Sequence, residues 1–231
     1  MPVSPNVTTA SRNGIPQVLY YLLVAVVVAF TCVMLTMVFP YLSFERAINF
    51  LGTKPDKVLD NRVFLVAFYV HITTSFVALF GGVWQFSTVI YRRFPKLHRR
   101  IGMLYVVSIL FLAAPSGMVL AAYANGGLPA RVGFSFQCIV WWAATAAAWH
   151  AIRQKNYLRH NEMMLRSYAI TLAALALRSE SYLMYYLFET KPIETYVTVT
   201  WLSWVGNLIF AECLIIGGTG KRLLTAFVSH F

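Results

Sequence analysis

The chain has 231 residues, of which 59% are hydrophobic and 12% are charged, and its formal net charge is +11. This composition is too apolar for an ordinary soluble globular domain and excludes that class. The basic excess does not predict nucleic-acid binding, because the basic residues gather in alternate loops between long apolar segments.

A helix needs about 20 mostly apolar residues to cross the hydrocarbon core of a bilayer. Six segments are long enough: 18–40, 63–90, 101–123, 132–152, 163–188 and 196–217. They use most of the chain, so the sequence predicts an all-α integral membrane protein with six transmembrane helices. We expect one transmembrane domain over residues 1–231, with helices two to five as its core bundle.

The loops predict the orientation of this bundle. If the N-terminus is inside, twelve basic residues fall on the inner side and six on the outer side. Cytoplasmic loops of membrane proteins carry such an excess of Lys and Arg. We therefore expect both termini in the cytoplasm, a location in the bacterial cytoplasmic (inner) membrane, and membrane lipids as partners.

In the second helix, His71 is an ionisable residue well inside an apolar segment. Such a group costs roughly 2.5–3.5 kcal/mol at the bilayer centre, so it usually faces a protein interior or a wet cavity. Its helical face is otherwise small or polar: Thr74, Ser75, Ala78, Gly82 and Gln85. His71 is a candidate general acid or base, and a hydrogen bond to a helix carbonyl is the structural alternative.

The third helix contains Pro115-Ser116-Gly117, which predicts a kink, because proline leaves a backbone carbonyl without its donor. Gln137 and Trp141 of the fourth helix are expected to line the same outer cavity. With residues of the second and fifth helices, the full set of candidate cavity residues is Gln85, Ser116, Gln137, Trp141, Glu180 and Tyr182.

The fifth helix holds Arg178, which shares one face with a polar stripe that includes Ser167 and His160. Glu180 lies about 200° away around the helix, so it cannot pair with Arg178 on that face. His71 and Arg178 both fall in the outer half of the membrane, and we expect helices two and five to present them to one cavity.

His98 and His160 lie at the inner ends of helices three and five, and His150 ends helix four nearby. A straight fifth helix would separate His160 from Arg178 by about 27 Å. The sequence therefore predicts two polar sites, or two ends of one path.

Four motifs together resemble a bacterial family of multi-pass membrane proteins of unknown function: HITTSFVALFGGVWQF, PKLHRRIGMLYV, APSGMVLAAYANGG and RHNEMMLRSYAITLAALALR. The resemblance covers roughly residues 66–190, and Met163 stands where the family usually has Trp. A more distant likeness to four-helix b-type cytochromes implies haem held between histidines of neighbouring helices. His98 and His160 would then be the ligands, with His150 as a substitute. The outer side has only His71.

These features favour a membrane-embedded redox protein that binds haem b or a single metal ion through His98 and His160. One alternative is a cofactor-free enzyme acting on a lipid or isoprenoid, with His71 as acid or base and Arg178 holding an anionic group. Another is a small transporter or proton path along the stripe. A hydrophobic or anionic small-molecule ligand and assembly into a homo-oligomer are both compatible with the sequence. The motifs of easily recognised enzyme classes are missing from it.

The orientation makes a prediction about topology. Reporters fused after Phe231 and inserted in the 153–160 loop should both read cytoplasmic, because both segments lie on the side rich in Lys and Arg. An external reading at either position would reverse the assignment of the two histidine levels.

Overall fold

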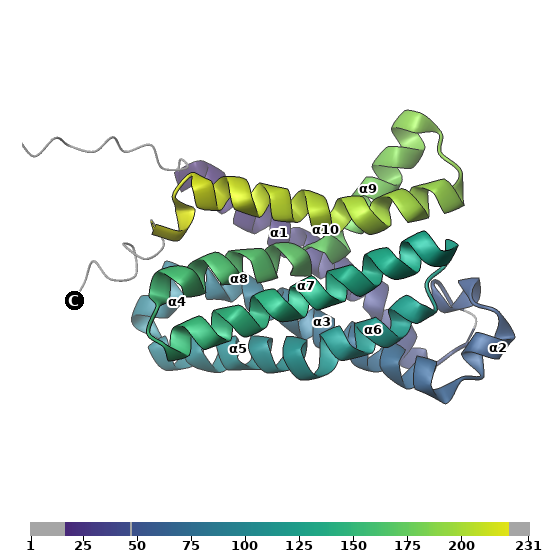
Figure 1. Cartoon of the computed structure of the whole chain (residues 1–231), viewed down its shortest axis with the longest axis horizontal. Helices are drawn as coiled ribbons and strands as arrows, with labels where there is room; N and C mark the ends of the chain where they lie inside the picture. The colour runs from purple at the N-terminus through teal and green to yellow at the C-terminus, as the bar shows by residue number, and fades with distance from the viewer. Residues whose placement is uncertain (1–16, 47, 222–231) are drawn as a thin grey trace, which may run out of the picture.

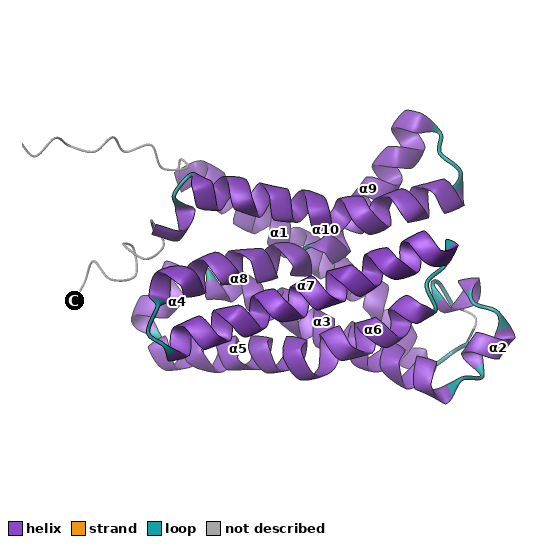
Figure 2. Cartoon of the chain, viewed as in Figure 1, coloured by secondary structure: helices purple, strands orange, loops and turns teal. Residues whose placement is uncertain are grey.

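The computed structural model describes residues 17–46 and 48–221, and within them the secondary structure is helical, with no strand (Figure 2). The helices are α1 (Gln17–Val38), η1 (Phe39–Ser43), η2 (Leu51–Thr53), α2 (Asp56–Leu59), α3 (Arg62–Gln85), α4 (Thr88–Arg93), α5 (Pro95–Val107), η3 (Ser108–Ala113), α6 (Ala114–Ala122), α7 (Gly127–Arg153), α8 (Tyr157–Thr171), α9 (Ala173–Phe188) and α10 (Pro192–Ile216).

Five of the helical segments are long and apolar enough to cross a membrane: Ala25–Ser43, Arg62–Gln85, Pro95–Ala122, Gly127–Arg153 and Pro192–Ile216. They agree with five of the six segments that the sequence predicts. The segment 163–188 differs, because it belongs to two shorter helices, α8 and α9, that meet at Leu172. Neither is long enough to be a candidate span by itself.

The break at Leu172 occurs without a proline or glycine. The Thr171 hydroxyl donates to the carbonyl of Ser167, one turn earlier on α8. Such back-bonding by Ser and Thr often bends a helix. The continuous polar stripe and the 27 Å axial separation were therefore wrong: α9 turns away from the direction of α8, and Arg178 lies on α9 (Figure 1).

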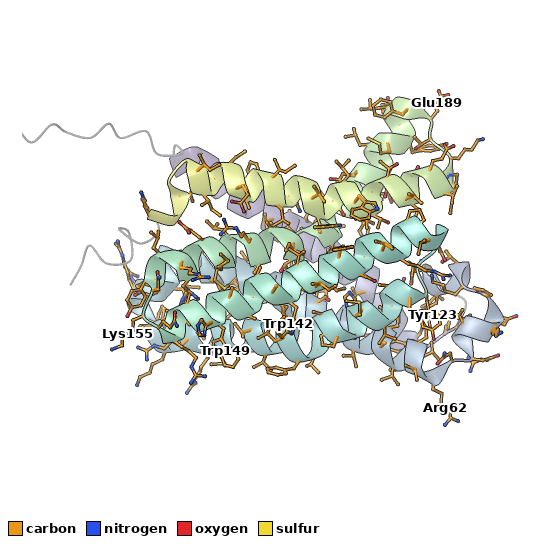
Figure 3. The ribbon with its side chains drawn as sticks, viewed as in Figure 1. Arg62, Tyr123, Trp142, Trp149, Lys155 and Glu189 are labelled. Atoms are coloured by element: carbon orange, nitrogen blue, oxygen red, sulfur yellow. The ribbon has the colours of Figure 1, made fainter. Side chains whose placement is uncertain are left out.

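The long helices lie side by side and alternate in direction (Figure 1). One end carries α4 and the α7–α8 turn, and we call it the basic end, because its exposed side chains include Lys96, Arg99, Arg153 and Lys155. The opposite end, here the cap end, carries η1, η2 and α2. Figure 3 shows Trp149 and Lys155 at the basic end and Arg62, Tyr123 and Glu189 at the cap end.

The main buried cluster joins the second to fifth predicted helices, namely α3, α5 to α6, α7 and α8. Its buried members are Ala78, Tyr105, Val106, Ile109, Leu110, Ala113, Ala114, Trp141, Ala148, Met164, Tyr168 and Ile170. Small residues in this set allow close helix contact, as membrane bundles require. Many large apolar side chains are exposed instead, among them Phe111 at 62% and Ile216 at 84%. A soluble monomer rarely exposes so much apolar surface.

The kink predicted at Pro115 is present as a π-helical turn, η3, which immediately precedes α6. π-Turns inside α-helices frequently occur at functional sites. Ala114 N–H bonds the Ile109 carbonyl five residues earlier, so the next carbonyl, that of Leu110, lacks a donor from Pro115 and accepts from Trp142 Nε1 at 3.1 Å instead. The Ser116 hydroxyl donates to the carbonyls of Leu112 at 2.5 Å and Ala113 at 3.1 Å. The irregular helix predicted at this proline is therefore present, but the freed carbonyl accepts from Trp142 and not from Ser116.

Lys54 ties the cap to the turn between α6 and α7. Its ammonium donates to the Tyr123 carbonyl at 2.6 Å and to Asn125 Oδ1 at 2.8 Å, and it lies 4.6 Å from the centre of the Phe50 ring. Only 6% of Lys54 is exposed. Burial, with a smaller contribution from the positive charge of Arg131, lowers the pKa of Lys54 to about 8.

This pKa predicts how the stability of the cap depends on pH. The unfolded chain keeps the ordinary pKa of 10.5, so between pH 8 and 10.5 it binds more protons than the folded chain. The contribution of Lys54 to stability therefore rises with pH across this window, by about 1.4 kcal/mol for each unit of pKa difference. Thermal unfolding of wild type, Lys54→Met and the exposed control Lys57→Met at pH 7.5 and pH 10 measures it. Between pH 7.5 and pH 10, the stability of wild type and of Lys57→Met should rise relative to that of Lys54→Met. The same change of stability with pH in all three proteins would contradict the role of Lys54.

Candidate functional site

His98 and His160 lie together at the basic end, and we call them the histidine pair. α5 begins at Pro95 and places His98 in its first turn, while Asn156 caps α8 through its side chain and places His160 in the first turn of that helix. The two imidazoles are near enough to interact electrostatically. The sequence prediction that these residues share one level therefore agrees with their positions.

Each member of the pair keeps a ring nitrogen available. His160 Nδ1 lies 2.9 Å from the carbonyl of Ala148, so Nδ1 carries the proton and Nε2 keeps its lone pair. His98 Nδ1 is buried and has no hydrogen-bond partner among the described residues, and Asn161 Nδ2, next to His160, is in the same state. Buried polar atoms without partners are rare and call for an explanation.

Residues of α3 and α4 hold His98 in place. Gln85 Nε2 donates to the His98 carbonyl at 3.2 Å, and the Tyr91 ring meets the imidazole edge to face at 5.2 Å between centroids. Gly102 permits this contact, because a Cβ there would lie 2.9 Å from Gln85 Oε1. Gln85, expected to line a ligand cavity, thus lies at the histidine pair.

His71 joins α3 to the π-turn of the third span. Its Nδ1 lies 2.8 Å from the Ala113 carbonyl, and its Nε2 lies 3.5 Å from the Ser75 hydroxyl. The Ser116 hydroxyl reaches the same Ala113 carbonyl. The imidazole packs directly over Gly117, where a Cβ would lie 2.8 Å from His71 Cε1. This arrangement matches the structural alternative for His71, a hydrogen bond to a helix carbonyl.

In the described part of the chain, the candidate residues of α9, namely Arg178, Glu180 and Tyr182, form no hydrogen bond with His71. Arg178 Nη1 donates to the carbonyl of Ala174 on its own helix, at 2.7 Å. Glu180 Oε2 is buried without a partner among the described residues. Tyr182 is 72% exposed. No hydrogen bond or ion pair joins Arg178 to His71 within residues 17–46 and 48–221.

A buried hydroxyl network between α5, α7 and α8 is the part that sequence reasoning missed. The Tyr105 hydroxyl bonds Ser167 at 2.8 Å and Thr171 at 3.0 Å, and Trp141 Nε1 donates to Thr171 at 3.0 Å. Thr145 bonds Ser167 at 2.7 Å. Every member is bonded, so the network is structural rather than a ligand site. Polar residues at helical spacing on 141 and 145 and on 167 and 171 were the available signal.

The remaining predicted cavity residues do not gather in one place. Trp141 belongs to the hydroxyl network, and Gln137 is half-buried on α7. Ser116 lines an apolar cavity of about 440 Å³ between α3 and α6, at the cap end, beside Arg62. A second cavity of about 430 Å³ lies between α7, α8 and α10 and includes the Arg166–Glu212 ion pair.

The described residues contain no group of three or more His, Cys, Asp or Glu side chains arranged to hold a metal ion. Among the described residues, the histidine pair therefore has no third His, Cys, Asp or Glu side chain placed to share a metal ion with it. Two axial imidazoles are sufficient for haem, whereas a structural zinc site takes four ligands and a catalytic one usually three from the protein.

The helical bundle, its exposed apolar surface and its five candidate spans define a multi-pass integral membrane protein. Residues 68–215 match the family described as "Predicted membrane protein (DUF2306)", and the chain belongs to this family, whose function is unknown. The match extends beyond the resemblance seen at residues 66–190 and takes in most of α10. No curated protein and no solved structure shows significant similarity to the chain.

The packing of His71 on Gly117 predicts an energetic coupling between them. Gly117→Ala should destabilise the protein by about 1–3 kcal/mol, because the new methyl group meets the imidazole. In a His71→Ala background the same change should cost less, with the remaining cost set by Cys138 Sγ, which lies 3.0 Å from the new atom. Gly206→Ala, whose nearest neighbour is 4.0 Å away, is the control and should be tolerated. Thermal unfolding measures all four; an equal cost of Gly117→Ala in both backgrounds would contradict the contact.

Proposed function

We propose that the protein is a membrane-embedded redox protein that binds one haem b at the histidine pair. The observation that carries the proposal is the position of His98 and His160 in the first turns of α5 and α8, at the same end of the bundle, with a ring nitrogen on each that has no hydrogen-bond partner among the described residues. Bis-histidine ligation needs two imidazoles from neighbouring elements and no other protein ligand. A single metal ion has less support, because the described residues give it no further His, Cys, Asp or Glu.

The residues around the pair suit this role. A ligating histidine commonly donates its other ring N–H to a backbone carbonyl, which fixes the tautomer and raises the basicity of the ligating nitrogen. The Ala148 carbonyl does this for His160. Gln85 fixes the backbone at His98, and Tyr91 packs against its ring. Bound haem would supply one-electron chemistry, and the protein would supply ligation, orientation and an apolar environment.

The topology of the proposal follows the sequence. We place α8 and α9 together as a broken fifth crossing, which gives six spans in a single domain. The basic end faces the cytoplasm, so that both termini are cytoplasmic and the protein lies in the bacterial inner membrane. The exposed Arg99 and Arg153 beside the histidine pair support this orientation. The haem then lies near the inner face.

The alternatives have weaker support in the geometry. An enzyme acting on a lipid needs His71 and Arg178 to face one substrate. Each is instead hydrogen-bonded to a helix carbonyl, His71 to that of Ala113 in η3 and Arg178 to that of Ala174 in α9. A proton path along the stripe needs continuity from His160 to Arg178, which the break at Leu172 interrupts. We therefore favour the histidine pair as the functional centre.

The haem proposal is tested by absorption spectroscopy of protein purified from cells supplied with haem. Wild type should show the Soret and α bands of a b-type cytochrome, and the pyridine haemochrome should give about one haem per chain. His98→Ala and His160→Ala should each lose the haem while the protein still inserts, because each removes one axial ligand. His150→Ala, an exposed neighbour on α7, is the control and should keep the spectrum. A colourless wild type, or equal loss in the control, would refute the proposal.

A further inference from the structure

The apolar cavity between α3 and the third span is open toward the lipid, and we call it the α3 groove. Its volume is about 440 Å³, within the range of small-molecule binding sites. Two apolar walls form it: Val63, Val66 and Val70 of α3, and Phe111, Leu112 and Pro115 of the third span. Val66 is 63% exposed and Phe111 is 62% exposed, so the groove opens away from the bundle. Its occupant in a membrane therefore comes from the bilayer.

The deeper part of the groove favours an apolar occupant. Among the described residues that line it, the polar ones are Arg62 and Ser116. Ser116 is only 7% exposed, and its hydroxyl already donates to two backbone carbonyls of its own helix. A polar ligand would gain no hydrogen bond from it, whereas a hydrocarbon chain needs none.

Arg62 lies where the groove reaches the surface of the membrane, because α3 and the candidate span both begin at this residue. It lies at the cap end (Figure 3). Its side chain is exposed and has no ion pair among the described residues, since the nearby Asp60 is paired with Arg46 at 2.7 Å. Val70 follows Arg62 by eight residues, or about 12 Å along the helix. The groove thus combines a cation at the membrane surface with apolar walls below it.

The N-terminus of α3 adds to the positive charge at Arg62. The first turn of this 24-residue helix contains no acidic residue. Asn61 Oδ1 accepts from the N–H groups of Val63 at 2.9 Å and Phe64 at 3.4 Å, but an uncharged cap leaves the helix dipole in place. A cation beside the positive end of a helix is unfavourable unless an anion offsets it. Charge complementarity therefore calls for an anion at Arg62.

We propose that the α3 groove binds an anionic phospholipid, with its phosphate at Arg62 and one acyl chain between the walls. A phospholipid has its charge at the membrane surface and its chains below, which is the order of Arg62 and the groove. The planar guanidinium can donate two parallel N–H bonds to phosphate oxygens. The acyl chain lies against Val66 and Phe111 and extends toward Val70. This assignment does not depend on haem at the histidine pair.

A second copy of the chain would fit the groove less well than a lipid. Helix contacts in membranes favour small residues, whereas the exposed walls here carry large ones such as Val66 and Phe111. A twofold contact uses the same surface on both chains, so it would bring a second Arg62 to the interface. Among the described residues, no acidic side chain lines the groove to offset the two charges. The phosphate of a lipid supplies that negative charge.

Photolabelling of the full-length protein in phosphatidylethanolamine nanodiscs tests the headgroup. The probe is phosphatidylglycerol with a diazirine midway along one acyl chain, and phosphatidylcholine with the same chain is the comparison. In wild type, phosphatidylglycerol should label peptides of α3 and the third span saturably and at least fivefold more than phosphatidylcholine, because it alone has a net negative charge. Arg62→Gln should abolish this preference, and Arg62→Lys should keep part of it. Lys57→Gln, an exposed cap cation outside the groove, should keep it fully.

Val66→Trp tests the groove itself. The larger side chain fills the space between the walls and should lower labelling by both probes at least tenfold. Val33→Trp, at a position of α1 that is 50% exposed and outside the groove, is the control and should leave labelling unchanged. Thermal unfolding identifies the variants that fold, and the exposed change Arg62→Gln keeps the test valid if Val66→Trp does not.

Several results would overturn the proposal. Equal labelling of the groove by the two probes in folded wild type would exclude recognition of the anionic headgroup, and so would an unchanged preference in Arg62→Gln. Labelling confined to other segments would exclude the groove as the site. A mapped disulfide between two Val66→Cys chains would make this face a contact between copies of the chain.

Discussion

The structure depends on one constraint: inside hydrocarbon, water cannot satisfy a polar group, so the protein must do so itself. The third span shows the result most clearly. Pro115 removes a backbone donor, the helix passes through a π-turn, and Trp142 Nε1 donates to the Leu110 carbonyl that this leaves free. His71 and Ser116 both contact the neighbouring carbonyl of Ala113. The hydroxyl network around Tyr105 and the ion pair of Arg166 with Glu212 follow the same rule. These polar residues fix how neighbouring helices meet.

We propose that function lies at the exceptions to this rule. Among the described residues, the buried side-chain atoms without a partner include His98 Nδ1 at the histidine pair and Trp204 Nε1 on α10. At the same end of the bundle as His98, His160 Nε2 keeps its lone pair because Nδ1 bonds the Ala148 carbonyl. His71 looked the stronger candidate from its depth alone, yet its hydrogen bond to Ala113 makes it part of the scaffold. Depth identifies a polar residue as important, and only its partners separate support from chemistry.

Sequence patterns predicted the helical class, five of the spans and the consequences of Pro115, because span length and proline chemistry are local properties. The break at Leu172 was not predictable in the same way, since no proline or glycine marks it and the back-bond of Thr171 also occurs at Thr145 inside the continuous helix α7. Helical geometry correctly excluded an Arg178–Glu180 pair but, applied to a straight helix, placed Arg178 on the stripe of His160. The partners of Trp141, Thr145 and Arg166 depend on which helices become neighbours, and one sequence does not determine that.

The central claim is that His98 and His160 together ligate one haem at the basic end of the bundle. Near-infrared magnetic circular dichroism of the oxidised protein tests it most directly, because the charge-transfer band of low-spin ferric haem identifies both axial ligands. The account predicts a bis-imidazole band in wild type and its loss in His160→Ala. A band typical of another ligand pair, or its persistence in His160→Ala, would contradict the account.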